Sequence, residues 1–114
     1  MGYYTIFLEM KGRRCVVIGG GTVAERKVEG LLRAGANVTV ISRAITKQLG
    51  ALAAEGKIGR VARPYGPGDL AGFQLAFVAT DDAAVTAAVK READKLGVWV
   101  NAADDPAQCD FILP

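Results

Sequence analysis

The sequence predicts a single α/β domain with a doubly wound parallel sheet, and three observations carry that prediction. Short apolar runs alternate with segments whose apolar residues recur at helical spacing, which is the pattern of β-α-β units. A glycine-rich loop joins the first apolar run to the first helical segment. No internal repeat or low-complexity tract divides the 114 residues, and that length suits one domain. Together these observations predict strand order 3-2-1-4-5, with ligands bound at the carboxyl ends of the strands.

Each expected element has its own sequence signal. Residues 15–18 form a continuous apolar run, as a strand that is covered on both faces requires. Apolar residues recur at near-helical spacing from 23 to 32, and Gly35 is expected to end that helix. The other expected elements are an extended segment at 5–8, strands at 38–41, 58–62 (weaker), 75–79 and 98–100, helices at 45–53 (ended by Gly56) and 83–96, and a turn-rich stretch at 64–68. The ligand-binding edge is then expected to be formed by the loops that start at Gly19, Ser42, Thr80 and Asn101.

The composition is that of an ordinary soluble domain. Apolar residues make up 51% of the chain and charged residues 23%, which allows a real core. The net charge of +2 is too weak to favour nucleic acid through phosphate contacts. No apolar run approaches the roughly 18 residues of a membrane span, and the first ten residues lack the pattern of a signal peptide. We therefore expect a cytoplasmic protein with no nucleic-acid or membrane partner.

The sequence has no histidine and only two cysteines, Cys15 and Cys109, which are far apart. In a cytoplasmic protein both are expected to be free thiols, with Cys109 as a buried structural one. Without histidine the commonest general base and the commonest metal ligand are missing. Acid–base chemistry must then come from carboxylates, Lys, Tyr or Cys, and no metal-ligating residues can be named.

The glycine-rich loop gives the firmest functional signal. Residues 19–24 read Gly-Gly-Gly-Thr-Val-Ala and fit G-x-G-x-x-G/A, after an apolar strand and at the start of a helix. Gly19 allows the tight turn, Gly21 lets the backbone approach a pyrophosphate, and Ala24 permits close helix–strand packing. The helix N-terminus adds free N–H groups and a positive dipole end. The loop predicts a Rossmann-type dinucleotide-binding domain, the alternative being a turn that binds nothing.

The end of the second strand leaves the choice of nucleotide open. NAD-specific domains place an acidic residue about 20 positions after the glycines. Here that place is taken by Ile41, Ser42 and Arg43. Ser42 can bond a ribose hydroxyl, and Arg43 can stack on adenine, meet a 2′-phosphate, or be a solvated loop residue. Taken alone, this segment favours NADP.

Polar residues also follow the fourth and fifth strands. Thr80 stands at a strand end, where contact with a cofactor is expected, and Asp81 or Asp82 is expected to cap the next helix. Asp104 and Asp105 follow the fifth strand at the same edge of the sheet. With no histidine in the chain, a carboxylate there is the natural proton acceptor, although turn formation would explain the pair equally well.

Several segments match the motifs of one known family, in the right order and over essentially the whole chain. The matches are a lead-in at 4–8, VGGGxVAxRK at 18–27 with Ile18 for the leading Val, A-A-T-D/N-D at 78–82, and VNxxDxP…FxxP at 100–106 and 111–114. The chain thus resembles the precorrin-2 dehydrogenase / sirohydrochlorin ferrochelatase domain of siroheme synthases.

The resemblance implies an enzyme of siroheme (porphyrin-type) biosynthesis in which NAD⁺ accepts hydride from precorrin-2 and sirohydrochlorin is formed. Many members then insert Fe²⁺, which makes them ferrochelatases and lyases as well as oxidoreductases. The essential aspartate would be Asp104, as general base and as a helper in chelation. Because the family uses NAD without the acidic residue, the resemblance favours NAD over NADP. Besides Gly19, cofactor contacts would fall on Gly21, Thr22, Val23, Arg43, Ala44 and Thr80.

The resemblance also bears on partners and on domain organisation. The tetrapyrrole substrate is rich in carboxylates, which would give Arg26, Lys27 or Arg63 an anionic partner, although spacing alone favours a solvated basic face for Arg26 and Lys27. Family members continue past 111–114 into a dimerisation region, so residues 1–114 would be the NAD-binding domain of a longer homodimer, too short to catalyse alone. The alternative is a non-catalytic NAD(P)-sensing module, against which the segments at 101–106 and 111–114 argue.

Overall fold

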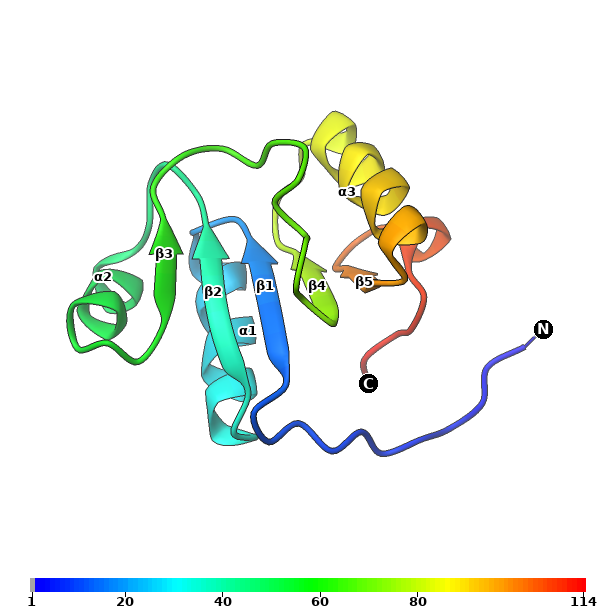
Figure 1. Ribbon diagram of the computed structural model, residues 1–114, viewed down its shortest axis with the longest axis horizontal. Coiled ribbons are helices and arrows are strands. Elements are labelled where there is room, and N and C mark those ends of the chain that lie inside the picture. Colours follow the sequence, from blue (N-terminus) through cyan, green and yellow to red (C-terminus); the bar gives the residue numbers. More distant parts are fainter. Residues whose placement is uncertain (1) are drawn as a thin grey trace.

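The computed structural model describes residues 2–114 and shows one parallel sheet in the order β3-β2-β1-β4-β5 (Figure 1). All four strand pairings are parallel, so the predicted class and strand order are confirmed. The strands are β1 (Arg14–Ile18), β2 (Asn37–Ile41), β3 (Gly59–Val61), β4 (Leu75–Val78) and β5 (Trp99–Ala102). The helices are α1 (Thr22–Arg33), α2 (Lys47–Ala54), α3 (Ala83–Leu96) and the short 3₁₀ turn η1 (Pro106–Gln108).

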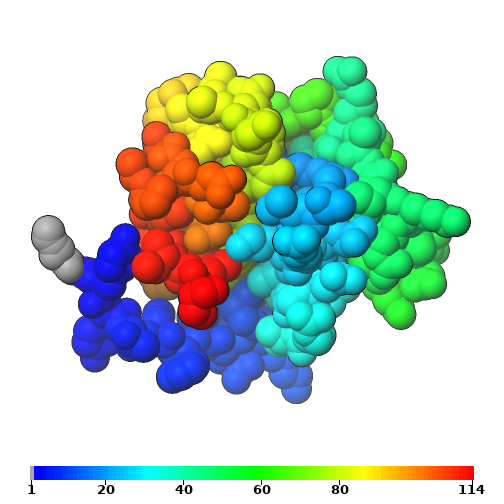
Figure 2. Space-filling view, turned by 180° about the vertical axis from the view of Figure 1, so that it is seen from behind, coloured from blue at the N-terminus to red at the C-terminus, as the bar shows by residue number. Residues whose placement is uncertain are grey.

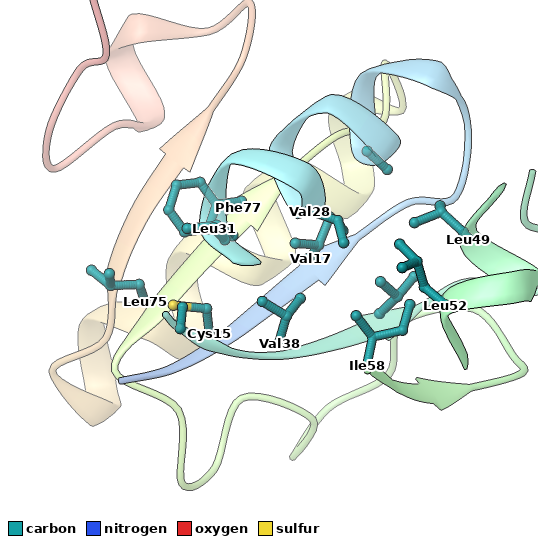
Figure 3. Close-up of a cluster of buried hydrophobic side chains, with 13 residues drawn as sticks. Cys15, Val17, Val28, Leu31, Val38, Leu49, Leu52, Ile58, Leu75 and Phe77 are labelled. Atoms are coloured by element: carbon teal, nitrogen blue, oxygen red, sulfur yellow. The ribbon is translucent and has the colours of Figure 1, made fainter. Parts of the chain in front are cut away.

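Helices cover both faces of the sheet, because alternate strand residues point to opposite sides. Figure 3 shows one cluster, in which Cys15, Val17 and Val38 of the strands lie against Val28 and Leu31 of α1. Leu49 and Leu52 of α2 belong to the same cluster, together with Val40 of β2 and Ile58, the residue just before β3. The other face packs α3 through Val89 and Ala93 against Val16 and Ile18. Burial raises the pKa of the Cys15 thiol to about 11, so this cysteine behaves as an apolar core residue.

Helix ends follow the predicted signals, with one shift. Gly35 lies just after α1 with φ +84°, and the N–H groups of Gly35 and Ala36 return to the carbonyls of Leu32 and Leu31. The helix expected at 45–53 instead spans Lys47–Ala54, because the Thr46 hydroxyl accepts the N–H of Leu49 and caps the helix there.

Residues 5–8 lie outside every strand, in an exposed N-terminal segment that extends from the body of the domain (Figure 1). One expectation about strands needs correction. The fifth strand begins at Trp99 and reaches Ala102, so Asn101 lies inside the sheet, paired with Phe77, and does not start a loop. Asn101 tolerates burial because its amide donates to the carbonyl of Phe111 at 3.1 Å. No helix among residues 2–114 is long and apolar enough to cross a membrane.

Candidate functional site

Three loops meet at the carboxyl edge of the sheet, where the strand order reverses. The N–H of Gly19 donates to the carbonyl of Ile41 at 3.0 Å, and the N–H of Thr46 donates to the carbonyl of Gly20 at 2.9 Å. On the other side the N–H of Ala79 donates to the carbonyl of Ile18 at 2.8 Å. The glycine loop is therefore held between the chain ends that leave β2 and β4, in the crevice where such sheets bind ligands.

The three glycines of this loop meet different surroundings. Gly19 has φ +124°, and a Cβ there would lie 2.5 Å from the carbonyl oxygen of Ala79. A Cβ on Gly20 would lie 2.1 Å from the carbonyl oxygen of Ala44. A Cβ on Gly21 would have nothing within 4 Å. Packing of the chain thus requires glycine at 19 and 20, whereas at 21 the bare backbone faces open space.

The N-terminus of α1 opens into that same space. No side chain caps the helix at Gly21, and Thr22 and Val23 are exposed, with 43% of Val23 accessible. The first N–H groups of the helix are therefore free to meet an anion. Glu25, a residue that the sequence analysis missed, accepts a hydrogen bond of 2.7 Å from the Thr46 hydroxyl and ties α1 to the start of α2. The sequence did offer one sign of its role, because an acidic side chain in the first turn of a helix interacts favourably with the helix N-terminus.

The segment after β2 is fixed by its own hydrogen bonds. The Ser42 hydroxyl donates to the carbonyl of Ala44 at 2.7 Å. Arg60 on β3, also missed from sequence, donates to the carbonyls of Arg43 at 2.7 Å and Ser42 at 3.2 Å. The side chains of Arg43 and Ala44 stay exposed. Because the single proton of Ser42 is committed, this hydroxyl offers a ligand only its lone pairs.

The segment after β4 divides its polar residues between two tasks. Asp82 caps α3, accepting the N–H groups of Ala84 at 3.0 Å and Val85 at 3.3 Å, as the sequence predicted for one of the two acids. Asp81 is exposed and does not cap the helix. Thr80 is half-buried at the strand end, where its hydroxyl accepts the N–H of Asp82 at 3.2 Å.

The turn after β5 is built without the Asp104 side chain. The N–H of Asp105 donates to the carbonyl of Ala102 at 3.2 Å, and the carbonyl of Asp105 accepts from Gln108 at 3.0 Å. Cys109 closes the turn: its thiol accepts the N–H of Ala102 at 3.1 Å and lies 3.2 Å from the carbonyl oxygen of the same residue. Asp104 is exposed, and its carboxylate makes no hydrogen bond or ion pair within residues 2–114. The turn thus uses the backbone of Asp105 and neither carboxylate: the half-buried Asp105 side chain does not cap the 3₁₀ turn, and the Asp104 side chain is exposed.

The segment after this turn covers the outer edge of β5. Asp110 forms two hydrogen bonds with the backbone of Val100. Its N–H donates to the carbonyl of Val100 at 2.8 Å, and its carboxylate accepts the N–H of Val100 at 2.8 Å. The other carboxylate oxygen accepts from Lys90 at 2.7 Å, which raises the pKa of Lys90. Phe111 packs edge-on against Phe77, with ring centroids 5.7 Å apart. These contacts fasten the segment at 109–111 to β5 and α3, beside the turn that carries Asp104.

Two hollows flank the sheet. One of about 260 Å³ lies beside the Asp104 turn, where α1 meets the C-terminal residues that Figure 2 shows in red next to it. One of about 460 Å³ lies between α3 and residues 65–68. In the second, the Tyr65 hydroxyl donates to Glu92, and burial together with that carboxylate raises the pKa of Tyr65.

The connection into β4 is further held by Arg63 and Asp69, whose two hydrogen bonds of 2.7 Å leave Arg63 already paired.

The structure thus spreads the predicted site residues along one edge. Arg43 and Ala44 lie at the β2 end, Gly19, Gly21, Thr22 and Val23 at the centre, and Thr80 and then Asp104 toward β5. An extended dinucleotide bound across such a crevice spans this order of strands. Of the three cations expected to meet an anionic substrate, Lys27 lines the smaller hollow and Arg26 is exposed on α1, whereas Arg63 is engaged with Asp69.

Comparison with known proteins adds relatives to this geometry. A family described as "Putative NAD(P)-binding" matches residues 6–114. The siroheme synthase of Methylobacillus flagellatus is 45% identical over 109 residues, which cover 96% of this chain and 23% of the relative. The siroheme synthase of Nitrosococcus oceani is 44% identical over 114 residues, covering 100% of this chain and 24% of the relative. The chain therefore spans about a quarter of the length of the curated relatives that it matches.

A solved structure agrees with these relatives. The precorrin-2 dehydrogenase SirC superposes with a TM-score of 0.86 at 33% sequence identity, covering 98% of this chain and 55% of that one. At this level of identity and overlap the likeness extends beyond the general architecture of the sheet.

Proposed function

The chain belongs to the NAD(P)-binding family that matches residues 6–114, and from this premise we propose that it binds NAD⁺ for the oxidation of precorrin-2 to sirohydrochlorin in siroheme biosynthesis. One observation carries the proposal. The open backbone at Gly21 and the unpaired carboxylate of Asp104 share one edge of the sheet, in a chain related to siroheme synthases and to a precorrin-2 dehydrogenase.

The residues of the crevice fit a dinucleotide. Gly21 leaves room for a pyrophosphate, and the exposed first turn at Thr22 and Val23 offers N–H groups to it. Gly19 sets the turn that aims this backbone, and Thr80 would lie toward the nicotinamide end. When bound, NAD⁺ supplies the two-electron acceptor for the reaction.

The segment after β2 supports NAD over NADP. The Ser42 hydroxyl donates its proton to the carbonyl of Ala44, so it can accept a hydrogen bond from a ribose hydroxyl. A 2′-phosphate at the same place has no proton to donate, so its oxygen lone pairs would face those of Ser42 and repel them. Arg43 and Ala44 would then border the adenine end, with Arg43 free to stack on the base.

Asp104 is the proposed catalytic residue. Oxidation of precorrin-2 would remove one hydride and one proton from the macrocycle, and NAD⁺, when bound, would take up the hydride with its two electrons. The Asp104 carboxylate accepts the proton and, being exposed, returns it to solvent. In Fe²⁺ insertion, which we propose as a second activity of the whole protein, the same carboxylate would accept protons from the macrocycle nitrogens as they bind the substrate metal.

The whole protein would work as a homodimer, as the resemblance implies. The chain covers about a quarter of its curated relatives, so regions outside it, and the partner subunit, are expected to complete the substrate site. We accordingly expect no turnover by residues 1–114 alone.

The decisive experiment replaces Asp104 by Asn in the protein at its full natural length. Loss of the base should lower precorrin-2 oxidation by about 10²–10⁴-fold while NAD⁺ affinity, measured by calorimetry, stays unchanged. Asp105→Asn is the matched control, because it makes the same change of charge one residue away and should keep activity. Turnover unchanged in Asp104→Asn would reject the catalytic assignment. NAD⁺ binding by the wild type without any precorrin-2 oxidation would favour a nucleotide-sensing module.

A further inference from the structure

A single cationic side chain lines the hollow beside the Asp104 turn. The hollow, of about 260 Å³, is bounded by Lys27 on α1, by residues 101–103, by Pro106 and Cys109, and by residues 112–114. Lys27 supplies the charged side chain of this lining, next to the turn that presents Asp104.

The position of Lys27 on α1 links this hollow to the glycine loop. Residues four apart on a helix share a face, so Lys27 lies one turn beyond the exposed Val23 on the same side of α1. Arg26, three residues after Val23, is exposed and does not line the hollow, whereas Lys27 is half-buried and does. The face of α1 that starts at the phosphate-binding end thus runs into the hollow and ends on an ammonium group.

Lys27 has no counter-ion among the described residues. Within residues 2–114 its ammonium forms no ion pair, whereas Lys90 pairs with Asp94 and Asp110, and Arg63 pairs with Asp69. An ammonium group that lines a hollow and has no counter-ion is available to an anionic ligand.

We propose that Lys27 binds a carboxylate of the tetrapyrrole substrate and so holds the macrocycle over Asp104. The proposal rests on the proposed function and names one of its specificity-determining residues. A carboxylate suits this position because the Lys27 ammonium is cationic. The tetrapyrrole substrate carries several carboxylate side chains around its ring. A cofactor phosphate is the competing anion, but the free N–H groups that would receive it lie a full turn earlier on α1.

The test compares Lys27→Met with Arg26→Met in the protein at its full natural length. Both remove one positive charge from α1 and keep an unbranched stem, but only Lys27 lines the hollow. Sirohydrochlorin, titrated by its absorbance, should bind about 10- to 100-fold more weakly to Lys27→Met, as loss of a charge-assisted hydrogen bond predicts. Lys27→Arg should retain most of the affinity, and Arg26→Met should bind like the wild type. The KM for precorrin-2 should rise in parallel with kcat little changed.

Calorimetry with NAD⁺ shows whether Lys27 binds a carboxylate of the substrate or a phosphate of the cofactor. The Kd for NAD⁺ should stay within about twofold in Lys27→Met, and a rise equal to that for sirohydrochlorin would assign the lysine to the cofactor and overturn the proposal. Sirohydrochlorin affinity unchanged in Lys27→Met, or lost equally in Arg26→Met, would overturn it as well. If the wild type binds sirohydrochlorin but does not oxidise precorrin-2, the proposed function fails while the binding comparison still decides the role of Lys27. If the wild type does not bind sirohydrochlorin at all, both proposals fail.

Discussion

At the scale of single residues, Gly20 and Gly21 are neighbours in the chain that serve different ends. A Cβ at 20 would collide with the backbone oxygen of Ala44 at 2.1 Å, so glycine there is a condition of folding. At 21 the same atom would meet nothing within 4 Å, so packing of the chain does not require glycine there. The sequence pattern treats the middle glycine as a free position, yet packing excludes a Cβ there as it does at Gly19.

This contrast gives a paired prediction. Gly20→Ala should destabilise the domain by about 1–3 kcal/mol or more, since a backbone atom must move to admit the methyl group. Gly21→Ala should leave the free energy of unfolding nearly unchanged but weaken NAD⁺ binding at least tenfold, because the methyl group would fill the approach to the pyrophosphate. Urea unfolding and calorimetry measure the two effects. Equal losses of stability in both variants would contradict the distinction.

At the scale of elements, the connection from β3 into β4 is held by charges. Asp69 accepts both guanidinium hydrogen bonds of Arg63 and the N–H of Gly66 at 2.8 Å, and the hydrogen bond from Arg63 is the main cause that lowers the pKa of Asp69. Glu92 of α3 holds the same connection through the Tyr65 hydroxyl and the N–H of Gly68. The buried Leu70 then packs under α3. This long loop is therefore ordered without regular secondary structure.

The lowered pKa of Asp69 gives a pH-dependent prediction. A carboxyl group whose pKa is lower in the folded state adds stability above its unfolded value, 3.8, and this stability disappears as the pH falls through the lower folded value. Asp69→Asn should therefore be less stable than the wild type at pH 7, and the difference should shrink below about pH 3.8. Urea unfolding across this pH range measures it. Asp81→Asn, which removes an exposed carboxylate, should show no such trend, and a difference that persists at acid pH would refute the ion-pair explanation.

At the scale of the whole molecule, the parallel sheet places four loops at one edge and orders them from β2 to β5. Arg43 and Asp104 are 61 positions apart in the chain, yet both belong to that edge. The carboxyl ends of parallel strands necessarily share one side of the sheet, so a single extended ligand can touch all four loops. Binding should accordingly stabilise the domain as a unit.

Ligand-linked stability tests this view and the choice of nucleotide. A ligand present at about 100 times its Kd that binds only the folded state raises the free energy of unfolding by about 2.7 kcal/mol. NAD⁺ should therefore raise the melting temperature by several degrees, and NADP⁺ at the same concentration should raise it less, because Ser42 presents lone pairs to the ribose position. Gly21→Ala is the control that should lose the effect. An equal or larger shift with NADP⁺ would reverse the assignment of the cofactor.

Local signals in the sequence gave most of the fold and part of the candidate site. Apolar periodicity marked the strands and helices, since burial imposes a repeat on each element, and the C′ glycine and the cap at Asp82 were readable because they act over a few residues. Contacts between distant segments could not be predicted from the sequence. The roles of Gly20, Glu25 and Arg60 depend on residues about 20 positions away, and no local sequence pattern indicates them.

The sequence by itself determined the class, the strand order and the identity of the glycine loop, because these follow from periodicity and from the handed connection of parallel strands. Only the tertiary structure decided how the carboxylates and cations divide their work. It showed that the turn after β5 uses the backbone of Asp105 and leaves the Asp104 carboxylate exposed, and that within residues 2–114 Arg63 forms an ion pair with Asp69 whereas Lys27 forms none. The reason is physical: whether a charge is free depends on which other charges the fold brings within a few ångströms, and that is a property of the assembled chain.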